Sequence, residues 1–543
     1  MKVSSYNNAY QGNSATKPAW SANNMIKKNS FPQLGLLSIV VLASITSPAS
    51  ANNFSLNSEK EEQGKVVTNI AASTNRLIIK FKTPKNIKNT PAAAISKAQT
   101  ASALSMLSAF QAKPLRYTSN GAQVYSLGET LDINTVESLA KQISNDSAVE
   151  YAEPDYILTK QEMPNDARYS EQWNYYEKPG GINLPDAWNI TAGSTKTTVA
   201  IIDTGLVKHP DIDTKRILPG YDFISDAWTA NDGNGRDNDP LDTGDAINAG
   251  ECGQDSFGNP VPAKDQPSSW HGTHVAGIIA ASGNNQQGIV GIAWKSNILP
   301  IRVLGKCGGY TSDIADGIRW AAGLNVLDAP KNQYPAQVIN MSLGGKHACG
   351  RTYQNAISDA IAQGTTIIVA AGNSADDASQ YTPANCKGVI SIAATNRNGD
   401  KSYYSNYGQS VDVAAPGGET RIIQNGHAQQ QTYNGILSTI EGGYAFYQGT
   451  SMAAPHVAGL AALMYSVNPK LTPTTTKQIL KDTAKVFSAN ATLCKKYGCG
   501  TGIIDAGAAV KKAKSLLDED TTTPPTPETD NSCSWLDWNC WPY

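Results

Sequence analysis

The chain has 543 residues, of which 40% are hydrophobic and 17% charged, and this length predicts two or three folded units with room for a large buried core. Lys and Arg number 44 and Asp and Glu number 46, which gives a net charge of −2. Because there is no long basic run and no heptad pattern, the sequence favours neither a nucleic-acid-binding protein nor a coiled coil.

The first 51 residues have the features of a secretory signal. Two lysines at 27–28 precede an apolar stretch over 34–45, which is followed by Pro-Ala-Ser-Ala at 48–51. This arrangement predicts signal cleavage after Ala51 and a secreted, extracellular protein. The apolar stretch is shorter than the roughly 20 residues of a membrane-spanning helix, so we expect no stable membrane insertion. The segment ahead of Met25 is long for a signal, and we hypothesise that translation begins at Met25.

Residues 52–162 are predicted to form a small α+β unit. The run 76–82 has strand character, the runs 92–109 and 133–144 have helical character, and 149–156 is expected to be extended. A polar stretch then leads to Met163 and is typical of a cleavable junction. No catalytic combination of residues stands out in this unit.

From residue 163 onward, strand-like and helical segments alternate. Strands are expected at 198–202, 297–303, 337–342, 365–370 and 388–393, with helices such as 312–324 and 354–363 between them. This alternation predicts an α/β fold in which helices cover both faces of a parallel sheet. In such folds the functional residues lie at the carboxyl ends of the strands.

Three short segments carry the residue types of a serine hydrolase. The segments IIDTG at 201–205, HGTH at 271–274 and GTSMAAPH at 449–456 contain, in this order, Asp203, His271 and Ser451. A serine hydroxyl is a poor nucleophile at neutral pH, so it needs a base and a carboxylate that orients the base. The order Asp, His, Ser is known among serine hydrolases. For an Asp after a strand, a turn or a helix cap is the alternative role.

These segments resemble those of the subtilisin-like serine endopeptidases, the subtilases, and the similarity extends from Pro164 to Lys514. The resemblance implies a secreted bacterial preproenzyme whose nucleophile is Ser451, whose base is His271 and whose orienting carboxylate is Asp203. The segment VAAGNS at 369–374 is similar to the family's oxyanion segment, which implies that Asn373 donates its side-chain amide. The same resemblance gives structural roles to His274 and His456.

The resemblance also implies a cleft in which an extended substrate binds as a strand between two glycine-containing edges. The primary specificity pocket should lie between 342–344 and 370–372. The expected cleft residues are Gly305, Gly308, Gly309, Ser342, Leu343, Gly344, Ala370, Ala371 and Gly372. The partners expected are protein and peptide substrates, and the propeptide as an intramolecular inhibitor, with the enzyme itself a monomer.

Calcium is the expected cofactor, because subtilases such as thermitase bind one ion through an N-terminal Asp, the Asp of a His-Pro-Asp sequence and a later loop. Calcium prefers six to eight oxygen ligands. The matching side chains are Asp166, Asp211 and Asn285, and the matching carbonyls belong to Ser282, Gln287 and Ile289.

An acidic insertion over 232–242 predicts a second calcium loop, since its carboxylates repel one another unless they are neutralised. The expected ligands are Asp232, Asn234, Asp237, Asp239 and Asp242. The spacing and the terminal Glu of an EF-hand are missing, and a solvated acidic loop is the alternative.

All eight cysteines lie at residue 252 or later, namely Cys252, Cys307, Cys349, Cys386, Cys494, Cys499, Cys533 and Cys540. An even number in an exported protein predicts disulfides, although eight cysteines allow about 105 pairings. We expect neighbours to pair in order. A zinc site is the alternative, but the sequence has no CxxC pair and no HExxH motif.

The predicted organisation is a signal peptide over 1–51, an inhibitory propeptide over 52–162, a peptidase domain over 163–518 and a tail over 519–543. The tail joins a Pro/Thr linker to a Trp- and Cys-rich end, which is either a closed segment or an aromatic binding surface. We expect a secreted, calcium-stabilised serine endopeptidase. A catalytically silent subtilase-like binding protein is the alternative, although all four catalytic groups are present. A lipase would require a G-x-S-x-G motif, which Ser451 lacks.

Overall fold

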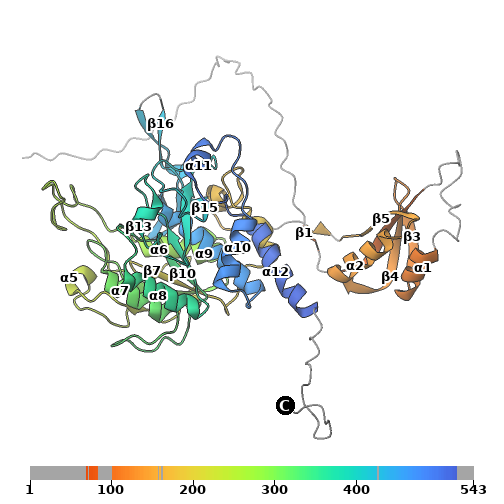
Figure 1. Ribbon diagram of the computed structural model, residues 1–543, viewed down its shortest axis with the longest axis horizontal. Coiled ribbons are helices and arrows are strands. Elements are labelled where there is room, and N and C mark those ends of the chain that lie inside the picture. The colour runs from red at the N-terminus through yellow and green to blue at the C-terminus, as the bar shows by residue number, and fades with distance from the viewer. Residues whose placement is uncertain are drawn as a thin grey trace, which may run out of the picture. The chain divides into compact units, whose positions relative to one another are not determined.

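The computed structural model describes residues 69–70, 73–82, 101–156, 158–159, 163–424 and 427–522. Figure 1 shows the chain as a small α+β unit before residue 160 and a larger α/β unit after residue 162. The predicted signal peptide and the Trp- and Cys-rich end of the predicted tail lie outside the described residues, whereas residues 519–522 of that tail belong to the helix α12 (Ala506–Thr522).

The small unit is built on a four-stranded antiparallel sheet with the order β3-β4-β2-β5. Leu77 and Ile79 lie on one face of β2 and pack against Val136 and Ile143 of α2. The predicted helix 133–144 is confirmed as α2, whose start is capped by the carboxylate of Asp132. The elements of the small unit are β1 (Asn69–Ile70), β2 (Ser73–Phe81), α1 (Ala101–Ala109), β3 (Lys113–Tyr117), β4 (Gln123–Asp132), α2 (Ile133–Ser144), β5 (Val149–Pro154) and β6 (Leu158–Thr159). The strands β1 and β6 pair with each other.

The large unit contains a parallel sheet of seven strands with the order β15-β14-β12-β10-β7-β9-β8. The strands are β7 (Thr198–Asp203), β8 (Tyr221–Asp222), β9 (Asn297–Arg302), β10 (Val338–Met341), β12 (Thr366–Ala370), β14 (Ile390–Thr395) and β15 (Val413–Pro416). The predicted α/β fold with a parallel sheet is therefore confirmed. The short strands β8 and β15 were not predicted, because two to four residues give too little pattern.

Each face of the sheet has its own hydrophobic core, because successive side chains of a strand point to opposite faces. Val199 and Ile201 of β7 pack in one core, together with residues of α6 (His271–Ala280), α9 (Thr450–Val467), α10 (Pro473–Asp482) and α12 (Ala506–Thr522). Ala200 and Ile202 pack in the other core with α7 (Thr311–Ala321) and α8 (Arg351–Ala362). The helices thus lie on both sides of the strands, as Figure 1 shows.

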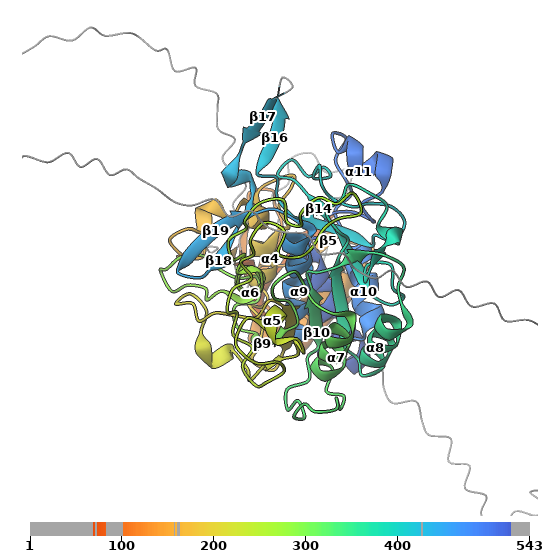
Figure 2. The same ribbon diagram turned by 90° about the vertical axis from the view of Figure 1, so that its left-hand side faces the viewer.

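Two antiparallel hairpins and several short elements complete the large unit. The hairpin of β16 (Arg421–Gln424) and β17 (His427–Gln430) projects from the body in Figure 2. The hairpin of β18 (Ile436–Ile440) and β19 (Gly443–Tyr447) packs on α6, where its Ser438 hydroxyl donates to the carbonyl of His274 at 2.6 Å. The remaining elements are α3 (Trp173–Tyr176), α4 (Leu184–Trp188), α5 (Ala227–Ala230), β11 (Gly345–Lys346), β13 (Tyr381–Thr382) and α11 (Thr492–Tyr497). Among the described residues, no helix combines the length and apolarity needed to cross a membrane.

Three disulfides join neighbouring cysteines in order, as expected, and no cysteine in the described residues is left for a zinc site. The pairs are Cys252–Cys307, Cys349–Cys386 and Cys494–Cys499. Cys533 and Cys540 lie outside the described residues.

Candidate active site

The carboxyl end of β7 and the first residue of α6 bring a carboxylate and an imidazole together. Asp203 is fully buried, and its Oδ1 lies 2.7 Å from Nδ1 of His271. Burial alone would lower the pKa of His271, but the charge of Asp203 and its hydrogen bond outweigh burial, so the pKa is raised above the usual histidine value. Since Nδ1 faces Asp203, Nε2 is the ring nitrogen left for proton transfer.

Hydrogen bonds through Thr204 connect these two segments. The Thr204 amide donates to Asp203 Oδ1 at 2.8 Å, and the Thr204 hydroxyl accepts the amide of Gly272 at 2.9 Å. The same hydroxyl donates to Asp242 Oδ2 at 2.6 Å. Thr204 and Asp242 therefore hold the strand of Asp203 against the start of the helix that carries His271.

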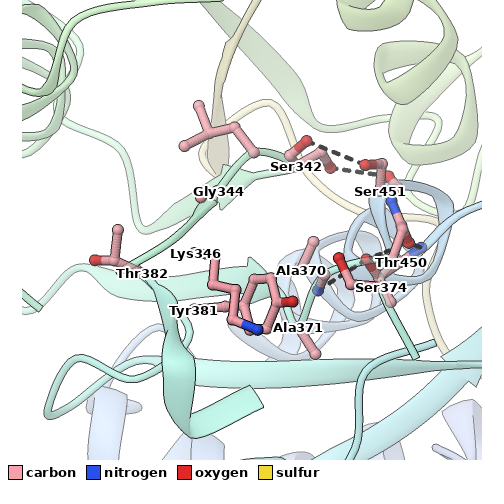
Figure 3. A pocket seen from close by; sticks show the side chains of 14 residues that line it. Ser342, Gly344, Lys346, Ala370, Ala371, Ser374, Tyr381, Thr382, Thr450 and Ser451 are labelled. Atoms are coloured by element: carbon pink, nitrogen blue, oxygen red, sulfur yellow. Dashed lines mark hydrogen bonds between the residues drawn. The ribbon is translucent and has the colours of Figure 1, made fainter. Parts of the chain in front are cut away.

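Ser451 occupies the second position of α9, close to the positive end of the helix dipole. Its hydroxyl donates to the carbonyl of Ser342 at 3.1 Å, and the Ser342 hydroxyl donates to the carbonyl of Ser451 at 2.8 Å (Figure 3). In the described part of the chain no hydrogen bond joins Ser451 to His271. Hydrogen bonds between catalytic groups often shorten only when a substrate is bound. In this structure, the carbonyl of Ser342 accepts the Ser451 hydroxyl instead.

The side chain of Asn373 is oriented by the residue before Ser451. Its Oδ1 accepts the amide of Thr450 at 2.8 Å and the hydroxyl of Thr450 at 2.9 Å. With the amide oxygen engaged, Nδ2 is left as a donor beside the start of α9. Asn373 and Ser451 line the same cavity, so this donor and the amides at the helix start can face one bound group.

The two other histidines of the segments 271–274 and 449–456 are buried and hydrogen-bonded to the backbone. His274 contacts the carbonyl of Ala445 at 3.0 Å, and burial lowers its pKa to about 3. His456 contacts the carbonyl of Met452 at 2.8 Å, and burial lowers its pKa to about 4. Both imidazoles are therefore neutral at physiological pH and hold elements together.

The first of two cavities at this edge of the sheet, of about 470 Å³, contains six of the predicted cleft residues. It is lined by Ser342, Leu343, Gly344, Gly345, Lys346, Ala370, Ala371, Gly372, Asn373, Ser374, Tyr381, Thr382, Thr450 and Ser451 (Figure 3). Gly372 has a φ of +107°, and a Cβ there would lie 2.3 Å from Nδ2 of Asn406, so glycine is required.

The second cavity, of about 610 Å³, holds His271 and the three other predicted cleft residues, Gly305, Gly308 and Gly309. It shares 342–345 with the first cavity, so the two form one continuous cleft beside Ser451 and His271. Sequence reasoning missed several of its lining residues, which include Thr204, Asp245, Gln266 and Tyr353. Thr204 lies within the IIDTG segment but was not assigned a role, whereas Asp245, Gln266 and Tyr353 lie outside any recognisable motif and only the tertiary fold brings them to the cleft.

Most residues of the first predicted calcium site lie close together. Asp166 and Asp211 are 5% and 0% exposed, and burial raises the pKa of both carboxyls. The Asn284 amide donates to Asp166, and the Asn285 side chain lies 2.7 Å from Asp211, so one loop contacts both acids. Buried carboxylates without a cationic partner suit a divalent ion.

The other predicted ligands, Ser282, Gln287 and Ile289, lie on the same loop. The Ser282 amide donates to the Asp211 carbonyl, and the Ile289 amide donates to Asp211 Oδ2 at 2.8 Å. The described residues contain no group of three or more His, Cys, Asp or Glu side chains placed to hold a metal. The loop itself carries no acid, so the two carboxylates at this place are those of Asp166 and Asp211, and an ion there would draw its further oxygens from Asn285 and from carbonyls.

The predicted second calcium ligands divide into two groups. Four of them, Asp232, Asn234, Asp237 and Asp239, line a cavity of about 410 Å³. Arg302 Nη1 pairs with Asp232 at 2.6 Å and so neutralises part of this acidic cluster. Asp242 does not line this cavity, because it is buried and accepts hydrogen bonds from Thr204 and Gly244.

Comparisons with known proteins agree with this arrangement. A family model described as the subtilase family matches residues 194–500. An extracellular protease of Xanthomonas campestris pv. campestris is 44% identical over 447 residues, which cover 82% of this chain and 73% of that protein. An extracellular basic protease of Dichelobacter nodosus is 36% identical over 506 residues, which cover 92% of this chain and 80% of that protein.

Two further proteins are similar to part of this chain. Thermitase of Thermoactinomyces vulgaris is 36% identical over 307 residues, which cover 56% of this chain and 85% of that protein. The solved structure of a protease from Pseudoalteromonas arctica matches with a TM-score of 0.59 at 50% identity, covering 65% of this chain and all of that chain.

Proposed function

The chain belongs to the subtilase family of serine proteases, and we propose that it is a secreted endopeptidase that cleaves peptide bonds through an acyl-enzyme on Ser451. Its substrates are proteins and peptides that bind in extended form along the cleft. The contact of 2.7 Å between Asp203 and His271, at the edge of the cavity system that contains Ser451, carries this proposal.

In the first half of the reaction, His271 Nε2 accepts the proton of Ser451 Oγ while Oγ attacks the carbonyl carbon of the substrate. The buried Asp203 carboxylate stabilises the imidazolium that forms and keeps the tautomer fixed. His271 then gives the proton to the departing amine, and the acyl group remains on Ser451. In the second half, His271 takes a proton from water as the water oxygen attacks the acyl carbon, and it then returns this proton to Ser451 Oγ as the bond between Oγ and the acyl carbon breaks and the acid leaves.

The negative oxygen of the tetrahedral intermediate is stabilised by Asn373 Nδ2 and by the backbone amide of Ser451. The bonds from Thr450 to Asn373 Oδ1 support this role, because they fix the orientation of the side-chain amide, whose donor atom is Nδ2. The helix α9 adds the positive end of its dipole at the same point.

The N-terminal regions fit the life cycle of an exported protease. The relatives named extracellular proteases support export, and the sequence over 1–51 supplies a signal peptide. We assign residues 52–162 to an inhibitory propeptide, which ends just before the exposed Met163. The enzyme then acts outside the cell as a monomer, after removal of this propeptide.

Calcium is proposed as a stabilising cofactor. Asp166, Asp211 and Asn285, with the carbonyls of Ser282, Gln287 and Ile289, would hold the first ion, which would neutralise the two buried carboxylates. Asp232, Asn234, Asp237 and Asp239 offer oxygen ligands for a second ion, although Arg302 already pairs with Asp232. Neither ion takes part in the chemical steps.

The test is to express the full chain as wild type and as Ser451→Ala, and to measure casein hydrolysis and N-terminal processing near Met163. We expect the wild type to hydrolyse casein and to be processed, and Ser451→Ala to do neither. Ser358→Ala, the same change at an exposed position of α8, is the matched control and should behave as wild type. Identical behaviour of wild type and Ser451→Ala would instead favour a silent subtilase-like binding protein.

A further inference from the structure

The segment between α5 and α6 places a carboxylate in the cleft beside His271. Asp245 lines the cavity of about 610 Å³ together with Ile247, Gln266 and Pro267 of the same segment. Apart from two histidines and Tyr353, whose pKa burial raises to about 12, Asp245 is the one ionisable acid or base among the residues that line this cavity. The charge of this part of the cleft is therefore set largely by Asp245.

The side chain of Asp245 is held in one orientation. The amide and the hydroxyl of Ser269 donate to its two oxygens at 2.6 and 2.7 Å. These donors are neutral, and no Lys or Arg forms an ion pair with Asp245 in the described residues. Its negative charge is therefore fixed in place and is not cancelled by a cation of the protein.

The charged residue in the first cavity, unlike Asp245, is paired with another charged residue of the protein. Lys346 is the only charged residue that lines the cavity of about 470 Å³. Its ammonium lies 2.7 Å from Asp376 Oδ2, and this carboxylate also accepts the hydroxyl of Tyr381. Because Lys346 is already paired, the primary pocket offers a substrate little net charge, whereas Asp245 offers a full one.

The geometry of an extended peptide shows which side chain meets Asp245. Successive side chains of a strand point to opposite sides. If the residue whose carbonyl is attacked, P1, enters the cavity between 342–346 and 370–374, the preceding residue, P2, points to the other side. That side is the cavity lined by His271 and Asp245.

We propose that Asp245 selects substrates with a cationic side chain, Lys or Arg, at P2. This inference rests on the proposed endopeptidase function and adds a substrate preference to it. The ammonium or guanidinium of the P2 side chain would form an ion pair with Asp245, which no Lys or Arg does in the described residues. Asp245 acts here as a specificity determinant rather than as a catalytic residue.

A purely structural role for Asp245 makes a different prediction. By fixing Ser269, two residues before His271, it could affect the position and the pKa of the base. Such an effect would change the rate for every substrate equally. The ratio of kcat/KM between substrates that differ only at P2 cancels it, so this ratio isolates the contact with the substrate.

The experiment measures kcat/KM of the processed enzyme on peptide p-nitroanilides that share P1 and carry Lys, Ala or Glu at P2. We expect the wild type to prefer Lys over Ala by about fivefold and to disfavour Glu by a similar factor, as for a partly exposed ion pair. In Asp245→Asn, which keeps an acceptor for the Ser269 amide but loses the charge, both ratios should approach one. Raising NaCl from about 0.05 M to about 0.5 M should reduce the wild-type ratios.

Asp265→Asn is the matched control, because Asp265 lies on the same segment and accepts a backbone amide, that of Ala249 at 2.9 Å, but does not line the cavity. It should keep the wild-type ratios. The proposal is wrong if the wild type shows no P2 preference, or if Asp245→Asn lowers all rates while the ratios persist. An enzyme that cleaves none of the peptides, nor casein, would contradict the proposed function itself.

Discussion

At the scale of single residues, the surroundings of each imidazole decide what it can do. His274 and His456 are buried against carbonyls, which keeps them neutral, and burial lowers their pKa to about 3 and about 4. His271 is the one that contacts a buried carboxylate, and its pKa is raised instead. A histidine with a raised pKa is a stronger base, which suits the removal of a proton from serine.

The raised pKa of His271 predicts how kcat/KM depends on pH. Only neutral His271 can accept the proton of Ser451, so kcat/KM should rise with pH through the pKa of His271. Because this pKa is raised, the midpoint of the rise should lie above about pH 6.5. Asp203→Asn removes the main interaction that raises it, so the midpoint should move to lower pH while kcat falls by about 10⁴-fold. Peptide hydrolysis measured from about pH 5 to about pH 9 checks this, and an unmoved midpoint in Asp203→Asn would contradict it.

At the scale of elements, loops rather than the sheet itself complete the candidate site. Asp203 and His271 come from β7 and α6, but Asp242 lies on the loop between α5 and α6 and fixes Thr204 between them. The loop after α6 approaches both Asp166 and Asp211. Each loop therefore joins segments that are far apart in the sequence, and each can be tested separately.

Asp242→Ala tests the link between β7 and α6. The change leaves the Thr204 hydroxyl and the Gly244 amide without their acceptor, so the free energy of unfolding should fall by about 1–3 kcal/mol. Since the start of α6 carries His271, kcat should fall more than KM changes. Denaturant titration and peptide kinetics measure these effects. Asp265→Ala, an exposed acid of the same loop, serves as the control, and an equal loss there would argue against a specific link.

Chelation tests the loop over 282–289. Burial raises the pKa of Asp166 and Asp211, so without an ion their contribution to stability is largest at low pH and is lost as pH rises through the raised values. A bound calcium ion would replace these protons. A chelator should therefore lower Tm more at about pH 8 than at about pH 5. Asp211→Asn should remove most of this calcium-dependent shift, and a Tm insensitive to chelator at both pH values would exclude the ion.

At the scale of the whole molecule, two hydrophobic cores on opposite faces of one sheet hold the cleft edges in place. Helices α6 and α9, which carry His271 and Ser451, pack in one core, and α7 and α8 pack in the other. Cys252–Cys307 and Cys349–Cys386 tie loops next to the cleft to the body. The large unit therefore combines a rigid interior with crosslinked loops, as suits a protein exposed to other proteases.

The disulfides should differ in their contribution to stability according to the length of chain they close. Cys349–Cys386 spans 37 residues and Cys494–Cys499 spans 5. By the loop-entropy model, replacing both cysteines by serine should lower the free energy of unfolding by about 4 kcal/mol for the first pair and about 2 kcal/mol for the second. Denaturant titration of the two double variants measures this. An equal or reversed order would show that local contacts, rather than loop closure, dominate.

Much of the fold could be predicted from the hydrophobic pattern of the sequence alone. The runs that became β7, β9, β10, β12 and β14 are apolar and separated by helical segments, so the parallel sheet could be predicted. The helix α2 was predicted with its observed bounds. Short strands such as β8 and the hairpin of β18 and β19 were missed, because their pairing depends on distant partners. The domain boundaries and the roles of the catalytic residues remain predictions.

The sequence by itself determined the family of the chain and predicted its chemistry, because Asp203, His271, Ser451 and Asn373 stand in long motifs with restricted neighbours. It also determined the parallel sheet, since hydrophobic periodicity is local. Only the tertiary structure decided that Asp242 bonds Thr204, that Asp245 enters the cleft and that Lys346 is paired with Asp376. The physical reason is that a side chain's partners depend on how loops cross between elements, and a charged loop residue looks the same in sequence whether it meets solvent, a hydroxyl or a substrate.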